Sequence, residues 1–482
     1  MTTPPHPHPP GPPPGCPAHP GPSTPPTGLP PLHGPGFAAD PDATYAWLRT
    51  AGPAHFVELA PGVEAVLVTG YDAALEVLRS PYFSKDARRW TALAQGRIRA
   101  DNEVVPMMGW RPSLWFADGE AHLRLRASVD LALSRINPHR LRAHVQHTAT
   151  ELIDGFASEG STDLVARYAD PLPAMVLARL LGCPSPLGAR MATACRQMID
   201  AEPAVAQEGG QNLAACLAEL VAAKRSAPGA DITSWLLEHP SGLSDTETVH
   251  QLVVLIGAGS VPQSSWISTA TMMLLADDRF AVDLTGGTLT VADALNEVLW
   301  RHSPLANFSF LYATQPYPLR DPRGRFLIPT GVPVLISHAA ANTDPTRPAH
   351  PEQRVANHSH LAFGAGRHAC PARGISGVIA ETAIELLLDR LPDMQLSVPG
   401  SALSWRPGPF HRALAALPVH FTPAPAAPAH PPTADGGPTW KPNPASPSST
   451  PPVPTDRRKP RTSAPGGRRR RWSFPVAFRR GR

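Results

Sequence analysis

Proline is concentrated at the two ends of this chain and limits how much of it can fold. Of the 61 prolines in 482 residues, 16 lie in residues 1–35 and 15 in residues 423–482. Because proline lacks an N–H and has a fixed φ, such segments favour extended polyproline over helices or central strands. We therefore predict Pro-rich disordered segments at residues 1–36 and 423–482, and one folded body over residues 37–422.

The formal net charge of +4 averages over unlike parts of the chain. Residues 423–482 hold 12 Lys and Arg against two Asp, whereas the body holds 31 basic and 37 acidic residues. The tail includes the run from Arg468 to Trp472, which mixes cations with an aromatic ring. Such a composition is able to bind anionic lipid, nucleic acid or an acidic protein. The alternative is a solvated, disordered tail without a partner.

Cysteine content and hydropathy indicate the compartment. Five cysteines in a chain of this length are too sparse and too irregularly spaced for a disulfide scaffold. No run of 18 apolar residues exists that could span a membrane, and prolines stand where a signal peptide needs an apolar core. The sequence predicts a soluble, cytoplasmic protein with no transmembrane segment.

Hydrophobic periodicity predicts a mainly α body with a small β region, folded as a single large domain. Helical spacing of apolar residues dominates the region 120–275, and further helices are expected at 71–78, 291–300 and 372–391. Short strands are expected at 55–59, 65–68, 308–312, 325–328 and 332–336. Many helices around a few short strands favour one helical domain over several small ones.

One loop carries most of the functional information. From Phe363 to Ala372 the chain reads Phe-Gly-Ala-Gly-Arg-His-Ala-Cys-Pro-Ala and then enters a predicted helix. Gly364 and Gly366 can let the backbone approach a bulky group closely. Backbone N–H groups and the positive end of the following helix stabilise a thiolate at Cys370, which is the form that ligates iron. The alternative is a buried structural cysteine beside an ordinary turn.

This loop resembles the haem-binding loop of the cytochrome P-450 family, whose usual pattern is Phe-Gly-x-Gly-x-His-x-Cys-x-Gly. Every position matches except the last, where this chain has Ala372. The resemblance extends from about residue 37 to residue 421. It implies a haem b cofactor with Cys370 as the axial thiolate ligand of the iron. It also implies that Phe363 covers the haem on the sulfur side and that His368 meets a propionate.

A second match supplies cations upstream of the cysteine loop. His122 and Arg126 are spaced i,i+4, which places both on one face of a helix, where they suit the two propionates. Taken alone, such spacing is more often a solvated basic face. Its position before the cysteine loop favours the haem-binding interpretation.

The distal helix departs from the family pattern Ala-Gly-x-Asp/Glu-Thr. Here Ala258 and Gly259, both expected beside the haem, are followed by Ser260, Val261 and Pro262. The carboxylate and the hydroxyl that relay protons in relatives are therefore both missing.

Nearby polar side chains are candidates for the missing proton relay. Ser260 and Gln263 are our catalytic candidates, as groups that position water and protons, and Ser264 is a third polar neighbour. Alternatively, these side chains bond the preceding helical turn and have no part in the reaction.

Two further departures concern arginines. Where the family has a Glu-x-x-Arg helix, this chain has Glu297 followed by Trp300, with Arg301 one place late, and so resembles some actinobacterial members that lack the arginine. Leu311 stands where relatives often have an arginine for a propionate. The propionates then depend more on His122, Arg126 and His368.

The resemblance implies a bacterial haem-thiolate monooxygenase that inserts oxygen from O2 into a small organic substrate. The chain has no convincing Gly-x-Gly-x-x-Gly nucleotide fingerprint after a strand, so a separate ferredoxin and ferredoxin reductase are expected to supply electrons. Two alternatives stay open. One is a haem-thiolate enzyme that uses peroxide or performs atypical chemistry, since the proton relay is missing. The other is a haem-containing binding or regulatory protein with little turnover.

Overall fold

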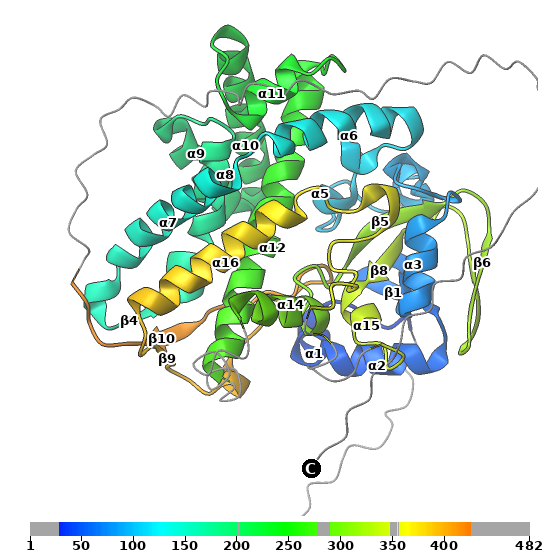
Figure 1. Ribbon diagram of the computed structural model, residues 1–482. Coiled ribbons are helices and arrows are strands. Elements are labelled where there is room, and N and C mark those ends of the chain that lie inside the picture. Colours follow the sequence, from blue (N-terminus) through cyan, green and yellow to red (C-terminus); the bar gives the residue numbers. More distant parts are fainter. Residues whose placement is uncertain (1–27, 200–202, 277–289, 348–353, 355, 426–482) are drawn as a thin grey trace, which may run out of the picture. The chain divides into compact units, whose positions relative to one another are not determined.

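The computed structural model describes residues 28–199, 203–276, 290–347, 354 and 356–425 (Figure 1). All of these residues belong to one compact unit. The Pro-rich segment before residue 28 and the basic tail after residue 425 lie outside the described residues. The expected binding of the tail to anionic lipid, nucleic acid or an acidic protein therefore stays a prediction.

Folded structure begins before the predicted boundary at residue 37. Helix α1 spans Gly34–Ala39, and Leu32 is completely buried. The N–H of Leu32 donates to the carbonyl of Glu58 at 2.8 Å, which adds an extended segment to the edge of the main sheet. Prolines are compatible with such an edge because the N–H groups that they lack would face solvent. At the other end, Ala424 N–H still bonds the carbonyl of Ala157 at 2.9 Å.

Helices make up most of the described unit, which confirms the mainly α prediction. They are α1, α2 (Pro41–Ala51), α3 (Tyr71–Arg79), α4 (Thr91–Ala94), α5 (Val105–Met108), α6 (Gly119–Ser134), α7 (Pro138–Asp154), α8 (Pro171–Leu180), α9 (Ser185–Ile199), α10 (Pro203–Ser226), α11 (Ile232–Glu238), α12 (Asp245–Ala276), α14 (Val291–Arg301), α15 (His338–Asn342) and α16 (Arg373–Arg390). The helices predicted at 71–78, 291–300 and 372–391 correspond to α3, α14 and α16.

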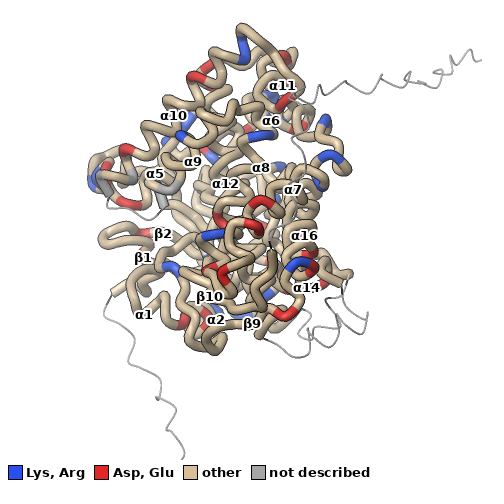
Figure 2. Tube along the Cα trace, turned by 90° about the vertical axis from the view of Figure 1, so that its left-hand side faces the viewer, with Lys and Arg blue, Asp and Glu red and all other residues tan. Residues whose placement is uncertain are grey.

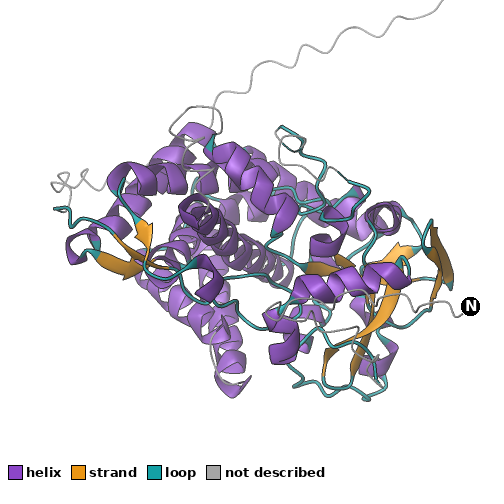
Figure 3. Cartoon of the chain, turned by 90° about the horizontal axis from the view of Figure 1, so that it is seen from below, coloured by secondary structure: helices purple, strands orange, loops and turns teal. Residues whose placement is uncertain are grey.

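Strands lie at separate places in the unit, with helices between them (Figure 3). Among the described residues, a five-stranded sheet has the order β1 (Ala54–Ala60), β2 (Val63–Val68), β8 (Val334–Ser337), β5 (Asn307–Ala313) and β3 (Phe83–Ser84). A second sheet contains β4 (Ser161–Asp163), β10 (Pro418–His420) and β9 (Gln395–Leu396), and β6 (Tyr317–Asp321) pairs with β7 (Gly324–Ile328). Strands β3, β4, β9 and β10 escaped prediction because two or three residues are too few to show alternation.

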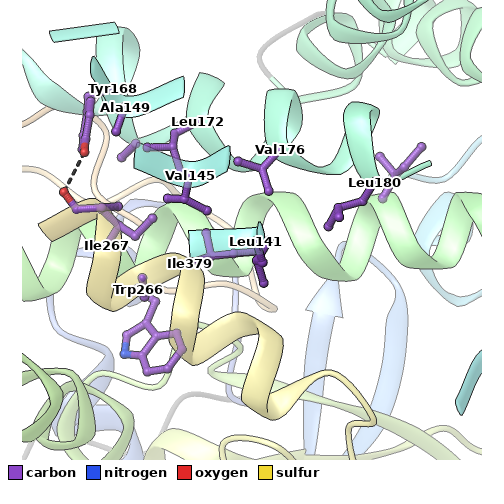
Figure 4. Packing of buried hydrophobic residues seen from close by; sticks show 14 of the residues in the cluster. Leu141, Val145, Ala149, Tyr168, Leu172, Val176, Leu180, Trp266, Ile267 and Ile379 are labelled. Carbon is purple, nitrogen blue, oxygen red and sulfur yellow. Dashed lines mark hydrogen bonds between the residues drawn. The ribbon is translucent and has the colours of Figure 1, made fainter. Parts of the chain in front are cut away.

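The largest core cluster fastens α16 to the other helices. Leu141 and Val145 of α7 pack with Leu172 of α8 and Ile267 of α12, and all four side chains are buried (Figure 4). Burying an aliphatic side chain of this size contributes about 1.5–3 kcal/mol. Tyr168 adds a buried hydrogen bond, because its hydroxyl donates to a backbone carbonyl of α16 at 2.6 Å. These contacts fix the helix whose N-terminal end carries the cysteine loop.

Charge on the described unit is mixed. Basic and acidic positions alternate over the trace in Figure 2, in agreement with the near balance of charges in the body of the sequence. The strongly basic segment belongs to residues outside the described ones. No helix in the described part of the chain is long and apolar enough to cross a membrane.

Trp300 on α14 holds the segment that precedes the cysteine loop. The residue is completely buried, and its indole N–H donates to the carbonyl of Asn357 at 2.9 Å. Its ring meets the ring of His360 edge-on, with centroids 5.9 Å apart. Trp300 therefore connects α14 to this segment from the position where the Glu-x-x-Arg pattern has its arginine.

Glu297 finds its cation elsewhere in the chain. Its carboxylate lies 2.6 Å from Nη1 of Arg354, whereas Nε of Arg301 is 4.0 Å away. Glu297 is 6% exposed and Arg301 is 44% exposed, so the buried partner is Arg354. Burial raises the pKa of Glu297, although Arg354 and Arg301 oppose that change. The departure at Trp300 therefore leaves the buried glutamate paired.

We expect Trp300→Ala to destabilise the protein by about 3–5 kcal/mol, because it leaves a cavity and an unpaired carbonyl at Asn357. Arg301→Ala, the matched control on the same helix, should cost less than about 1 kcal/mol, since its pair with Glu297 is long and exposed. Denaturant unfolding of the two variants measures the difference. A larger loss in Arg301→Ala would show that Arg301 has taken over the missing arginine's role.

Candidate functional site

The cysteine loop is closed by its own backbone. The N–H of Cys370 donates to the carbonyl of Phe363 at 2.9 Å, and the N–H of Ala369 donates to the carbonyl of Gly366 at 3.1 Å. Helix α16 begins at Arg373, so Cys370 lies just before its N-terminal end, as predicted. The unpaired N–H groups of that end favour negative charge on the sulfur.

The two glycines of the loop adopt backbone conformations that disfavour other residues. Gly364 has φ +68° and Gly366 has φ +70°. A Cβ at Gly366 would lie 2.6 Å from the carbonyl oxygen of Leu78, whereas the nearest atom to a Cβ at Gly364 would be 3.9 Å away. Gly366 therefore serves a close approach of the loop to α3, and Gly364 serves the turn alone.

The backbone conformation of Ala372 explains why alanine can replace glycine at the last position of the family's cysteine-loop pattern. Its φ is −99° and its ψ is 11°, values that an L-residue adopts without strain. The backbone of Ala372 hydrogen-bonds to the thiol of Cys370. The interaction with sulfur is a backbone one, so the methyl group of alanine does not remove it.

The charge around Cys370 is positive. Cys370 is exposed, but the protein atoms packed around its sulfur displace water; this desolvation is the largest effect and raises the pKa of the thiol above its ordinary value, while the hydrogen bond from Ala372 and the charges of Arg126 and Arg373 act to lower it. Arg373 also lies over the ring of Phe363, 5.5 Å from the centroid. When a metal cation ligates the sulfur, these same donors and cations stabilise the thiolate.

The structure brings the predicted propionate residues together. The rings of His122 on α6 and His368 in the loop lie with centroids 4.1 Å apart. Arg126 reaches the loop from the next turn of α6, where its Nη1 donates to the carbonyl of Ala369 at 2.9 Å. Residues separated by about 240 positions therefore form one polar face beside the cysteine.

Two unpartnered nitrogen atoms test whether this face fits a haem. Nε2 of His122 and Nε2 of His368 are buried and make no hydrogen bond among the described residues, although a carboxylate oxygen of Asp118 lies 3.6 Å from Nε2 of His368. Burial lowers the pKa of His122, and it lowers the pKa of His368 to about 4, so burial favours the neutral form of both rings. A buried donor without an acceptor costs about 1–3 kcal/mol. Two carboxylates, such as the propionates of a haem, would satisfy both histidines.

Helix α12 supplies the opposite wall. Gly257 and Ala258 are exposed in the middle of this helix, although most of its C-terminal half is buried, and Cys370 is exposed as well. The ring of Trp266 on α12 lies 5.8 Å from that of Phe363, so α12 passes close to the loop. Small accessible residues on a helix beside an accessible thiol suit a flat group held between them.

Gly259 has a packing role in addition to the haem contact predicted for it. A Cβ at this position would lie 2.9 Å from Cδ1 of Leu177, so glycine permits the close approach of α8 to α12. Its contact with haem stays a prediction, as does that of Ala258.

The three polar candidates on α12 all have protein partners. Ser260 donates to the carbonyl of Ile256 at 2.7 Å, one turn earlier. Gln263 donates to the carbonyl of Ser376 on α16 at 3.0 Å, and Ser264 donates to the carboxylate of Asp170. Only the bond of Ser260 is the one to the preceding turn that the alternative expects, since Gln263 and Ser264 bond residues of other elements. The catalytic roles of Ser260 and Gln263 stay predictions.

Sequence reasoning missed the roles of two residues beside the histidines. Asp118 accepts from the hydroxyl of Ser84 at 2.6 Å and from the backbone N–H of Lys85 at 2.9 Å, and it lies 3.6 Å from Nε2 of His368. Burial alone would raise the pKa of Asp118, but these polar neighbours hold it below its usual range. Lys85 itself is 5% exposed. No local motif marks their roles: Asp118 comes just before α6 and Lys85 directly follows β3, so only the folded chain brings them together.

Comparisons with known proteins agree with this site. No family model matches the chain. The chain is 32% identical over 400 residues to the cytochrome P-450 monooxygenase PikC of Streptomyces venezuelae, which covers 80% of this chain and 92% of that protein. It is 30% identical to 2-hydroxy-5-methyl-1-naphthoate 7-hydroxylase of Streptomyces carzinostaticus, covering 80% and 95% of the two chains. Among solved structures, CYP154C4 from Streptomyces sp. W2061 has a TM-score of 0.74 at 28% identity, covering 81% of this chain and 97% of that one.

The helical fold and the cysteine loop define a haem-thiolate oxidoreductase. The sequence identity to these relatives, over most of both chains, shows the family. The chain belongs to the cytochrome P-450 family, and it is a cytochrome P-450 monooxygenase. The predictions of family, fold class and enzyme class are thereby confirmed, together with a haem-iron cofactor held by a thiolate. The roles of individual side chains at the site stay predictions.

We expect Gly366→Ala to lower haem content far more than Gly364→Ala. Both changes force alanine into a left-handed conformation, which costs about 1–2 kcal/mol. Only Gly366→Ala also drives a methyl group into the carbonyl of Leu78. The ratio of haem to protein after purification, together with thermal unfolding, measures the effect. Equal losses in the two variants would contradict the close approach to α3.

Proposed function

We propose that this enzyme holds haem b through Cys370 and inserts oxygen from O2 into a small organic substrate, with electrons from a ferredoxin and its reductase. The observation that carries the proposal is the position of Cys370 just before the N-terminal end of α16, beside two buried histidine nitrogens without partners. When bound, the haem supplies the oxygen chemistry that side chains lack. The relatives named above support this class of reaction, since one is a monooxygenase and another a hydroxylase.

On the sulfur side, the chain's task is to hold the thiolate and exclude water. Phe363 packs edge-on against Trp266 and lies 5.9 Å from the ring of His360. Arg126 fixes the backbone just before the cysteine through Ala369. Together these contacts keep the loop in one conformation, which sets the electron donation of the sulfur.

On the opposite side, the chain must deliver protons without an acid–alcohol pair. Val261 and Pro262 occupy the two positions, and neither side chain can give or accept a proton. Pro262 lies inside α12, which continues past it to Ala276. Because proline has no N–H, the carbonyl of Ala258 lacks its helical donor and can hold a water molecule. We propose that such water, with Ser260 as a neighbour, replaces the missing relay.

A second candidate function follows from the same observation. A haem-thiolate enzyme that takes peroxide would need neither electrons from a ferredoxin nor the first proton delivery, so it would depend less on the two missing relay side chains. The absence of both relay residues at 261 and 262 favours some use of peroxide.

The cysteines of the described part of the chain are free thiols, namely Cys183, Cys195, Cys216 and Cys370. Free thiols are consistent with the reducing compartment proposed for a ferredoxin-driven enzyme.

We expect NAD(P)H consumption to be weakly coupled to product in this enzyme. General acid catalysis contributes roughly 10²–10⁴-fold where it operates, so its loss should divert much of the reducing power to hydrogen peroxide. A substrate is first found by haem spectral shift, and product, NAD(P)H and peroxide are then measured with ferredoxin and reductase. Pro262→Thr, which restores the hydroxyl, should raise coupling severalfold, and peroxide-driven turnover of the native enzyme should compare well with the ferredoxin-driven reaction.

Ser260→Ala is the cleaner test of the water path. Its hydroxyl bonds only within its own helix, whereas Gln263→Ala would also leave the carbonyl of Ser376 unpaired. Tight coupling in the native enzyme, unaffected by Ser260→Ala and Gln263→Ala, would contradict the proposed path. A normal haem spectrum without turnover on any substrate, by either route, would favour a binding or regulatory protein.

A further inference from the structure

Strand pairing places Lys85 beside the position of the missing propionate arginine. Strands β3 and β5 are antiparallel, with Phe83 opposite Ala313 and Ser84 opposite Tyr312. Lys85 directly follows Ser84 at the end of β3, and Leu311 directly precedes Tyr312 on β5. Leu311 is the residue that stands where relatives often have an arginine. The chain therefore has a cation one strand away from the position where it lacks one.

Lys85 is a largely buried residue, and its ammonium group has no carboxylate of the described chain within ion-pair distance. The residue is 5% exposed, and no carboxylate of the described residues lies within 4.0 Å of its Nζ. Its close contact is the ring of Trp115, whose centroid is 5.1 Å from Nζ. A cation–π contact offsets only part of the cost of burying a charge. A lysine in this position calls for a carboxylate or another anion.

The neighbouring carboxylate, Asp118, binds other groups through its Oδ2, while its Oδ1 has no hydrogen bond among the described residues. Asp118 accepts from Ser84 and from the backbone N–H of Lys85, and it faces His368 at 3.6 Å and Arg367 at 3.9 Å. Asp118 thereby connects the backbone of Lys85 to His368, the residue that is expected to meet a propionate. Lys85 is thus anchored next to His368, while its ammonium group is left without a carboxylate of the described chain.

We propose that Lys85 binds a haem propionate and so replaces the arginine that is absent at position 311. This proposal rests on the proposed haem site. Burial lowers the pKa of Lys85 to about 7, with Asp118 raising it and Arg367 lowering it. A propionate beside the ammonium group would raise that pKa again and keep the lysine charged. The same carboxylate chemistry could come from an acidic substrate, and the experiment separates the two sources.

The test measures the rate at which the holoenzyme releases haem to an excess of apomyoglobin. Lys85→Met keeps the length of the side chain and removes its charge. Loss of a charged hydrogen bond should make haem release roughly 10- to 100-fold faster. Lys85→Arg should release haem at nearly the native rate. Lys224→Met is the matched control, because Lys224 is another largely buried lysine, paired with Asp231 far from the site in sequence.

A double variant tests directly whether Lys85 replaces the arginine that relatives carry at position 311. Lys85→Met combined with Leu311→Arg should restore slow haem release, because the cation returns to the strand where relatives carry it. Should the buried arginine prevent folding, the single variants and the Lys224→Met control still decide the question.

Native-like haem release from Lys85→Met would overturn the proposal, and so would equal acceleration in Lys224→Met. A variant with unchanged haem release but weaker spectral binding of a fatty acid would assign the ammonium group to an acidic substrate instead. The reduced CO complex of Lys85→Met should keep its thiolate band, since Cys370 is untouched. Absence of that band from the native enzyme would be a failure of the haem site itself, and not of the role of Lys85.

Discussion

The hydrogen bond from Cys370 N–H to the carbonyl of Phe363 is the constraint on which the site depends. It closes the loop so that the sulfur lies just before the first turn of α16, where backbone donors and two arginines favour negative charge. The loop can take this shape because Gly366 passes against α3 without a side chain. The core that packs α16 against α7, α8 and α12 then fixes the helix that follows the sulfur.

Around this centre, the chain has other residues in place of family ones. Trp300 stands at the arginine position itself and bonds the segment before the loop through its indole N–H, and Glu297 pairs with Arg354. We propose a related exchange for Lys85, a largely buried lysine without a carboxylate of the described residues within 4.0 Å of its Nζ. In the first case a different donor acts from the same position, and in the second the cation comes from another segment.

Features carried by contiguous residues could be predicted from the sequence. The cysteine loop, the i,i+4 pair of His122 and Arg126 and the long helices all show local patterns, and the structure has them where they were expected. Contacts between distant residues could not be predicted in this way. Trp300 and Asn357 meet only because α14 packs beneath the loop, and Lys85 reaches its place only through strand pairing. The burial of Leu32 was missed because its proline neighbours obscured an edge-strand contact.

The central claim is that Cys370 is the thiolate ligand of a haem iron, and the reduced CO complex tests it most directly. The native protein should be red, and its reduced CO complex should absorb at the position diagnostic of thiolate ligation. Cys370→Ala should lose that band. Cys216→Ala, which removes a different cysteine that lies on α10, should keep it. Survival of the band in Cys370→Ala, or its absence from the native protein, would contradict the account.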